Sequence, residues 1–388
     1  MMIPRVISSK ILDAIQTFPA MVVTGPRQSG KTTLLKNLFP KVTYINLELP
    51  DQRSRAVQDP ELFLNTIELP VILDEIQYVP ELLPYIKDRI DKSRNPGSWF
   101  LTGSQLFPLM KGVSESLAGR IAVFSLLPFS LGEAPASEVS FAAKILRGSY
   151  PEMVINRKVD RDLWLGSYIN TYLERDVRNL ETIGDLRQFE IFMRLLATKT
   201  GQLLDQSELA KSIGVSVPTI DRWLSVLEAS YQIIMIYPYY KNIGKRLIKR
   251  PKIYFTDTGL ATYLLGIADT KQLINGPSWG ALFETAIVTD LWKQYLHKGQ
   301  RPPLYFLRTY DNLEVDLVVD KSDNIDLIEI KANASIKPSH ALSLEYALKT
   351  ITIPAKGYLV SLTKFDGPLT PIVTHISIDK FSNGKLTE

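Results

Sequence analysis

Short apolar runs alternate with helix-like stretches over about the first 130 residues of the chain. The runs MVVTG, VTYINL, VILDE, SWFLTG and IAVFSL each predict a strand, at residues 21–25, 42–47, 71–75, 98–103 and 121–126. Strands that alternate with helices are typical of an α/β domain, in which helices cover a parallel sheet. The first third of the chain is therefore predicted to form such a domain.

The pattern changes beyond these strands. Residues 132–140, GEAPASEVS, are rich in small residues and proline and are typical of a linker. Helical periodicity follows to about residue 200. Residues 206–230 then predict a helix, a glycine-containing turn and a second amphipathic helix, which is helix-turn-helix spacing. Two strand-like runs, 231–240 and 252–259, come next, so this region resembles a winged helix.

A last segment starts near residue 270. It predicts a helix, two strands, a second helix and two further strands, at residues 281–299, 314–319, 326–331, 340–350, 355–362 and 371–378. This mixture of elements indicates a further α/β domain.

Composition narrows the classes of site. Without cysteine, the 388-residue chain has no disulfide, zinc–thiolate site or thiol nucleophile, and its three scattered histidines argue against a histidine metal site. A net charge of +4 permits an anionic partner without requiring one. No apolar run reaches the length of a membrane span, and the N-terminus lacks the apolar core of a signal peptide. We therefore expect a cytoplasmic protein with no membrane partner.

The segment GPRQSGKTT has the G-x-x-x-x-G-K-[ST] spacing of a phosphate-binding loop. It lies between a predicted strand and a predicted helix, where glycines let backbone N–H groups and the helix N-terminus face phosphate. Lys31 is expected to reach the β- and γ-phosphates of ATP, and the Thr32 hydroxyl to bind Mg²⁺. The candidate ATP-binding residues are Gly25, Pro26, Arg27, Gln28, Ser29, Gly30, Lys31, Thr32 and Thr33.

Two acids end the predicted strand VILDE. Asp74 is placed to hold the magnesium ion through its water shell, and Glu75 to orient or deprotonate the attacking water, which favours hydrolysis over binding alone. Because the carboxyl ends of parallel strands meet at one edge, Ser104 or Gln105 is expected to sense the γ-phosphate. Arg120 is a candidate arginine finger for this or a neighbouring subunit. The expected catalytic set is Lys31, Glu75, Ser104 and Arg120.

The segments GPRQSGKTTL, VILDEIQ, FLTGSQ and ESLAGRIAVFSLLPFSLGE together resemble a large prokaryotic family of AAA-type ATPases. Its members carry a C-terminal domain of unknown function with a restriction-endonuclease-like core, and the resemblance covers nearly the whole chain. It implies the same roles for the phosphate loop and the two acids. The arginine finger stays open between Arg120 and Arg175, and a finger acting in trans would make the active species a homo-oligomer.

The helix-turn-helix region is a candidate nucleic-acid interface. Its second helix carries Ser216, Thr219 and Arg222 on one side, in the position that enters the major groove in many regulators. The following hairpin has a run of basic residues, which could grip phosphates without reading bases: Lys241, Lys245, Arg246, Lys249, Arg250 and Lys252. We expect a nucleic-acid partner, DNA in preference to RNA. A lid or protein-contact module with a solvated charge run is an equal alternative.

Acids and a lysine interrupt two apolar strands of the last segment. Glu329 and Lys331 share one face of their strand, and a hairpin would bring Asp316 beside them. Two carboxylates can hold one Mg²⁺, and the lysine can orient a water for attack on phosphorus. Glu284 on the preceding helix is a further acid. The pattern resembles the PD-(D/E)xK nuclease core, and the order helix–strand–strand–helix–strand agrees with it.

Two interpretations of this C-terminal site stay open. One is a metal-dependent nuclease, and the other is a nuclease-like fold kept as a binding module. A plain salt bridge between Glu329 and Lys331 would explain those two residues and leave Asp316 and Glu284 to chance.

The sequence thus predicts an α/β multidomain protein. The four segments are an AAA-type (ASCE) P-loop ATPase domain, a helical lid region, a winged-helix-like module and a restriction-endonuclease-like domain, at residues 1–135, 136–200, 201–268 and 269–388. We expect an ATPase that uses ATP and Mg²⁺ and couples hydrolysis to nucleic-acid binding or processing. The alternative is an ATP-dependent switch that binds a protein partner and does not cleave nucleic acid.

Overall fold

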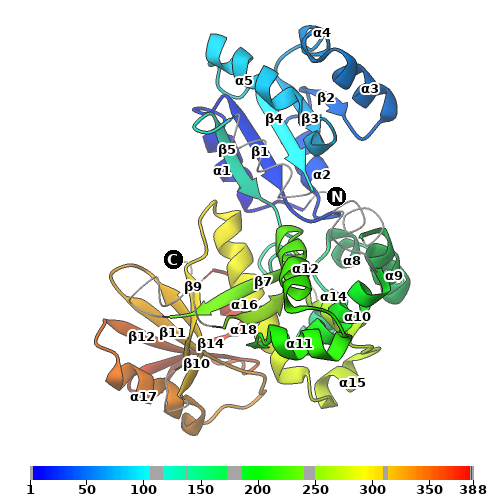
Figure 1. The fold of residues 1–388 in the computed structure, drawn as a ribbon. Coiled ribbons are helices and arrows are strands. Elements are labelled where there is room, and N and C mark those ends of the chain that lie inside the picture. The colour runs from blue at the N-terminus through cyan, green and yellow to red at the C-terminus, as the bar shows by residue number, and fades with distance from the viewer. Residues whose placement is uncertain are drawn as a thin grey trace. The chain divides into compact units, whose positions relative to one another are not determined.

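A computed structural model describes residues 3–104, 117–135, 139–172, 186–239, 250–308, 313–384 and 386 (Figure 1). The chain divides into two compact units. The first comprises Met1–Phe129 with two short later segments, Ala229–Tyr231 and Tyr295–Gln300, and the second comprises the remainder.

The first unit is built on a five-stranded parallel sheet of order β2-β3-β4-β1-β5. Its strands are β1 (Ala20–Thr24), β2 (Thr43–Asn46), β3 (Val71–Asp74), β4 (Trp99–Gly103) and β5 (Ile121–Ser125). All five strands predicted from the apolar runs are present within a residue or two of the expected bounds. The predicted α/β domain with a parallel sheet is therefore confirmed.

Helices cover both faces of this sheet because alternate strand residues point to opposite sides. Val22 and Leu101 pack in one hydrophobic cluster with helix α5, whereas Val23 and Phe100 pack in a second cluster with α1 and α2. The helices of this unit are α1 (Ile7–Ala14), α2 (Lys31–Leu38), α3 (Pro50–Gln58), α4 (Pro60–Asn65), η1 (Ile76–Tyr78) and α5 (Leu82–Lys92).

The second unit begins with a buried turn. Ser130 and Glu133 are 3 % and 6 % exposed, and the backbone N–H of Leu131 donates to Asp290 at 2.6 Å. A Cβ atom on Gly132 would lie 2.4 Å from the carbonyl oxygen of Ser382, so this position requires glycine. The start of the segment predicted as a linker is therefore anchored in the core of the second unit, and the composition of small residues reflects close packing.

The middle of the chain is helical, as predicted. Its helices are α7 (Phe141–Arg147), α8 (Pro151–Ile155), α9 (Arg161–Tyr172), α10 (Leu186–Ala197), α11 (Gln206–Ile213), α12 (Val217–Ala229), α14 (Thr258–Leu264) and α15 (Thr270–Asn275). Gly214 has φ +81° and ends α11, because the left-handed conformation that stops the helix favours glycine. The helix, turn and helix expected over residues 206–230 are present.

The strands of the second unit form one nine-stranded sheet of order β13-β14-β12-β11-β10-β9-β7-β8-β6. Their bounds are β6 (Gln202–Leu203), β7 (Ile233–Pro238), β8 (Lys252–Phe255), β9 (Leu304–Arg308), β10 (Glu314–Asp320), β11 (Ile325–Lys331), β12 (Ala355–Ser361), β13 (Gly367–Thr370) and β14 (Val373–Ser377). Parallel pairing of β7 with β9 joins the strands on either side of residue 268. The expected boundary there does not interrupt the sheet.

Helices of the C-terminal part complete the second unit: α16 (Trp279–His297), η3 (Pro338–Ala341), α17 (Leu342–Thr350) and α18 (Ile378–Ser382). Strands β10 and β11 are an antiparallel pair with Leu317 opposite Ile328. The register of β10 shifts between Val315 and Val318 in its pairing with β9, and the Asp316 carboxylate accepts from the backbone N–H of Ile330, next to Glu329 in the chain. Among the described residues, no helix has the length and apolar character needed to cross a membrane.

Candidate functional site: a phosphate loop and a carboxylate cluster

The phosphate loop follows β1 and leads into α2, the order that the sequence predicts. Gly25 has φ +145°, and a Cβ atom there would lie 2.1 Å from the carbonyl oxygen of Leu126. Gly30 has φ +93° at the start of α2. Both positions therefore require glycine, one for space and one for backbone conformation.

The loop provides an unused buried donor and a buried cation. The Lys31 ammonium donates to the carbonyl oxygens of Gly25 and Pro26, at 3.0 Å each, and its residue is 5 % exposed. The Ser29 hydroxyl is buried and has no hydrogen-bond partner. The Lys31 ammonium and the Ser29 hydroxyl are both donors of the loop. A bound phosphate group could accept hydrogen bonds from both.

Asp74 lies at the carboxyl end of β3 and accepts hydrogen bonds from three hydroxyl groups. Thr32 donates to its two oxygens at 2.9 and 3.0 Å, Tyr44 donates at 2.7 Å, and Thr102 donates at 2.5 Å. The predicted Thr32 and Asp74 pair is thus brought together, and these oxygen groups fit Mg²⁺, which prefers few protein ligands together with nucleotide phosphates. Burial, followed by the adjacent Asp74, raises the pKa of Tyr44 above its usual range.

Glu75 is held in an unusual backbone conformation next to Asp74. Its φ is +58°, in the left-handed region that is uncommon for residues other than glycine. The Ser104 hydroxyl donates to its two carboxylate oxygens at 2.8 and 3.1 Å, and the Gln77 amide also donates to this carboxylate. The backbone N–H of Glu75 donates to Thr102 at 2.9 Å. The structure therefore places the predicted Glu75 and Ser104 in direct contact.

Other predicted loop residues are more peripheral. The side chains of Gln28 and Thr33 are exposed, and Gln28 has φ +63°. Gln105 and Arg175 lie outside the described residues. The sequence did not predict Arg5, whose guanidinium donates to the carbonyl oxygens of Ser29 at 3.1 Å and Leu127 at 2.6 Å. Nothing in the local sequence marks such a distant brace.

Arg120 does not lie at the nucleotide site of its own chain. It precedes β5, which pairs in parallel with β1 from Ala20 opposite Ile121 onward. The phosphate loop follows the other end of these strands, about 16 Å away at roughly 3.3 Å per residue. Its guanidinium forms two hydrogen bonds with Asp91, at 2.5 and 3.0 Å. The expectation of a finger in the same subunit is thus wrong, and a role in a neighbouring subunit stays a proposal.

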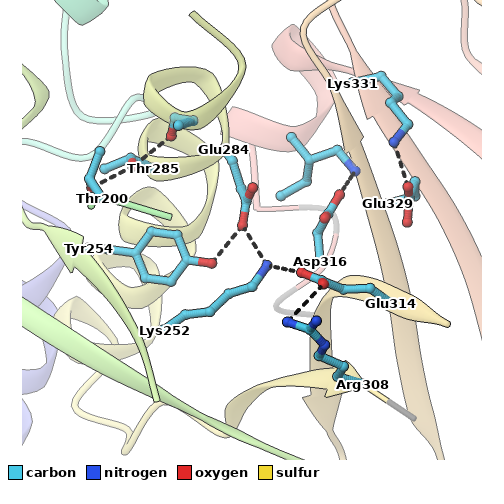
Figure 2. Close-up of polar contacts among 12 residues, drawn as sticks. Thr200, Lys252, Tyr254, Glu284, Thr285, Arg308, Glu314, Asp316, Glu329 and Lys331 are labelled. Atoms are coloured by element: carbon cyan, nitrogen blue, oxygen red, sulfur yellow. Dashed lines mark hydrogen bonds and ion pairs between the residues drawn. The ribbon is translucent and has the colours of Figure 1, made fainter. Parts of the chain in front are cut away.

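A second group of charged residues lies on strands of the nine-stranded sheet and on helix α16 (Figure 2). Lys252 on β8 is 3 % exposed, and its ammonium lies 2.6 Å from Glu314 Oε1 and 3.3 Å from Glu284 Oε1. The Tyr254 hydroxyl donates to the same Glu284 oxygen at 2.6 Å. Burial disfavours the charged lysine, but Glu284, Asp316 and Glu314 outweigh it and raise its pKa. The sequence suggested that Lys252 belongs to a solvated basic wing, but its side chain is buried and paired with two glutamates.

The predicted nuclease-like residues belong to this group. Asp316 accepts from the backbone N–H of Ile330 at 2.8 Å, and Lys331 donates to Glu329 at 2.6 Å. Burial and the nearby Asp316 raise the pKa values of Glu284 and Glu329 to about 7. Burial also raises the pKa of Asp316.

Three carboxylates of this group are paired with lysine side chains, and the metal role predicted for Asp316 and Glu329 stays a prediction. Across the residues that the structure describes, no group of three or more aspartate, glutamate or histidine side chains is arranged to hold a metal ion. Glu284 and Glu314 face Lys252, and Glu329 faces Lys331. The sequence identified the acids, but it did not identify Lys252 as the cation between two of them.

The helix-turn-helix presents a polar side. Ser216 and Arg222 are exposed, and Thr219 lies between them, 2.8 Å from the Ser216 hydroxyl and 3.4 Å from the guanidinium of Arg222. Arg250 is exposed and forms an ion pair with Asp205 at 2.8 Å. The other four basic residues of the predicted wing fall outside the described residues.

Three family models match the chain. Residues 17–134 match the AAA domain, which contains the phosphate loop, Asp74 and Glu75. Residues 139–271 match the Domain of unknown function (DUF8612), and residues 279–381 match the Domain of unknown function (DUF4143). The first unit therefore contains a P-loop domain of the AAA ATPase type.

Proteins similar to this chain include two mycobacterial sequences and several solved structures. The Walker-type ATPase PABY2304 of Pyrococcus abyssi is 17 % identical, with a TM-score of 0.45. The match covers 66 % of this chain and 94 % of that chain. The RuvB Holliday junction branch migration motor of Thermotoga maritima is 17 % identical, with a TM-score of 0.30 over 59 % of this chain and 88 % of the other.

The two mycobacterial sequences match over nearly the whole length. They are uncharacterized protein Rv2008c of Mycobacterium tuberculosis and uncharacterized protein Mb2031c of Mycobacterium bovis. Each is 32 % identical over 377 residues, which cover 96 % of this chain and 83 % of the relative. This protein belongs to the same family as Rv2008c and Mb2031c, with an AAA domain in residues 17–134.

Proposed function

We propose that this protein is a Mg²⁺-dependent ATPase that couples hydrolysis to the binding or processing of nucleic acid. The observation that carries the ATPase part is the position of Glu75. Its carboxylate is held by Ser104 and directly follows Asp74, which contacts the Thr32 hydroxyl. A carboxylate next to the magnesium residues can orient or deprotonate the water that attacks the γ-phosphate.

The proposed roles of the remaining residues follow from their chemistry. Lys31 would exchange its two carbonyl acceptors for the β- and γ-phosphates. Thr32 and Asp74 would hold Mg²⁺, the second directly or through water. Ser104 would keep the Glu75 carboxylate in place until nucleotide binds.

The middle of the chain supports the nucleic-acid part of the proposal. Helices α10, α11 and α12 accompany the small antiparallel sheet of β6, β8 and β7, which is the combination of elements in a winged helix. Helix α12 buries Trp223 and Leu224 and leaves Arg222 exposed. An exposed polar side on the second helix can enter a DNA groove.

The main alternative is an ATP-dependent switch with a protein partner. It is supported by the thin basic content of α12, where Arg222 is the cation on the exposed side. It is also supported by the pairing of Arg250 with Asp205 and of Lys252 with two glutamates. Paired cations release fewer counterions from a phosphate backbone.

The experiment that separates these functions is ATP turnover with and without nucleic acid. The rate would be measured with double-stranded DNA, single-stranded DNA and RNA of equal length, followed by a gel of the nucleic acid. The proposal expects DNA to stimulate turnover severalfold, and Arg222→Ala to weaken that stimulation. Arg194→Ala is the matched control because Arg194 is also exposed on a helix and pairs only with Glu190 among the contacts seen here. ATP turnover that no nucleic acid changes would favour the switch.

A further inference from the structure

The carboxylate cluster of the second unit contains its own cation. Among the described residues it brings together four carboxylates, Glu284, Glu314, Asp316 and Glu329, and three cationic side chains, Lys252, Lys331 and Arg308. The acids come from α16, β10 and β11, and the buried lysine comes from β8, so the cluster spans both sides of residue 268. Figure 2 shows the Lys252 ammonium between the carboxylates of Glu284 and Glu314.

The three cations do not have equal positions. Lys331 is partly exposed and its ammonium lies 2.6 Å from Glu329 Oε1, and the Arg308 guanidinium lies 3.8 Å from Glu314 Oε2. Lys252 is 3 % exposed and contacts two carboxylates at 2.6 and 3.3 Å. Its ammonium lies 5.6 Å from the centre of the Phe306 ring. A buried ammonium that contacts acids from two elements occupies the kind of place that a bound metal ion takes.

We infer that the Lys252 ammonium takes the place of the divalent cation in this nuclease-like cluster and keeps the cluster closed to metal. The cluster then acts as an ion-pair joint that ties β8 to α16 and β10. The inference does not depend on the ATPase activity, since every residue involved lies in the second unit.

Charge supports this assignment. With Lys252 in place, four carboxylates are balanced by three cations, so one negative charge is left over at most. Without it, the Glu284 and Glu314 carboxylates have no cation between them. Hard oxygen ligands with uncompensated charge are what Mg²⁺ and Mn²⁺ bind. The same two glutamates are therefore a closed site with the lysine and an open one without it.

The test is Mn²⁺ binding to the full nucleotide-free chain. The free ion is measured by electron paramagnetic resonance. Lys252→Met should gain one Mn²⁺ site per chain. The affinity of the cluster for Mn²⁺ should rise at least tenfold relative to the unaltered protein. Adding Glu284→Gln to that variant should abolish the gained site. Arg308→Met is the matched control, because it removes a cation from the edge of the same cluster and should gain no site. The phosphate loop is the same in every variant, so its contribution cancels.

A second comparison does not require Lys252→Met to fold. The unaltered protein and its Asp316→Asn and Glu284→Gln variants should take up Mn²⁺ equally, because the cluster binds none. Loss of a Mn²⁺ site in either variant would overturn the inference. So would a folded Lys252→Met protein, judged by circular dichroism, that gains no site.

Discussion

Removing one hydroxyl beneath the phosphate loop should destabilise the ATPase unit. The Tyr231 hydroxyl lies 2.7 Å from Thr24 Oγ1 and 3.0 Å from Ser125 Oγ. Thr24 ends β1 and directly precedes Gly25, and Ser125 ends β5. Tyr231→Phe keeps the ring and removes both contacts.

The backbone of Tyr231 indicates that its side chain matters. Its φ is +60°, and the N–H of Gln232 donates to the carbonyl oxygen of Leu227 at 2.8 Å, which closes the end of α12. Glycine is the usual residue in this left-handed position, and a residue with a Cβ atom costs about 1 kcal/mol more. The ring and hydroxyl of Tyr231 must offset that cost.

The expected loss follows from these contacts. Neutral hydrogen bonds contribute about 1 kcal/mol each, so Tyr231→Phe should lower the free energy of unfolding by about 1 to 2 kcal/mol. Tyr231→Gly recovers about 1 kcal/mol of backbone energy. It also loses about 2 to 3 kcal/mol of ring burial together with both hydrogen bonds, so its loss should be larger.

The assay is urea unfolding of the full chain. Because a chain of two units need not unfold in one step, the transition to follow is the one that a non-hydrolysable ATP analogue shifts. Tyr346→Phe is the control, since Tyr346 is 57 % exposed on α17. An unchanged midpoint in Tyr231→Phe, or a Tyr231→Gly protein more stable than the unaltered one, would refute this account of the contact.

Two further predictions concern pH and assembly. Burial raises the pKa of Asp290 from 3.8 to about 6, so the folded state binds the proton more tightly and stability should fall by up to about 3 kcal/mol between pH 4 and 6. Asp290→Asn should flatten that decline in pH-dependent urea unfolding, and an equally steep decline in the variant would contradict the assignment. If Arg120 acts in trans, specific ATPase activity should rise with protein concentration, and mixing Arg120→Ala with Lys31→Ala protein should restore turnover. A protein that sediments as a monomer, and whose ATP turnover nevertheless falls in Arg120→Ala, would contradict the trans role.

Much of the first unit follows from local sequence. Its strands are short apolar runs with polar ends, and the residues of the phosphate loop are contiguous. Asp74, Glu75 and Ser104 could be placed near the loop because parallel strands bring their carboxyl ends to one edge. Arg120 was expected near the nucleotide although it precedes β5 and therefore lies at the opposite end of the strand from the phosphate loop.

Contacts between distant segments could not be predicted in the same way. Tyr44 reaches Asp74 from the neighbouring strand, and Lys252 meets Glu284 and Glu314 only because β7 pairs with β9 and merges two sets of strands. In the sequence, Lys252 is one of several basic residues in a run. Lys252 is buried because its side chain points from β8 toward Glu284 on α16. The spacing of charged residues in the sequence does not reveal this direction.

Hydrolysis by Glu75 is the central claim, and turnover of a single variant tests it most directly. Glu75→Gln removes the carboxylate and leaves Lys31, Thr32 and Asp74 in place, so the variant should bind ATP with nearly unchanged affinity. Its single-turnover hydrolysis should be at least about 100-fold slower, because a general base contributes that much or more. Lys31→Ala, the companion variant, should lose nucleotide binding itself. Normal hydrolysis by Glu75→Gln would contradict the account.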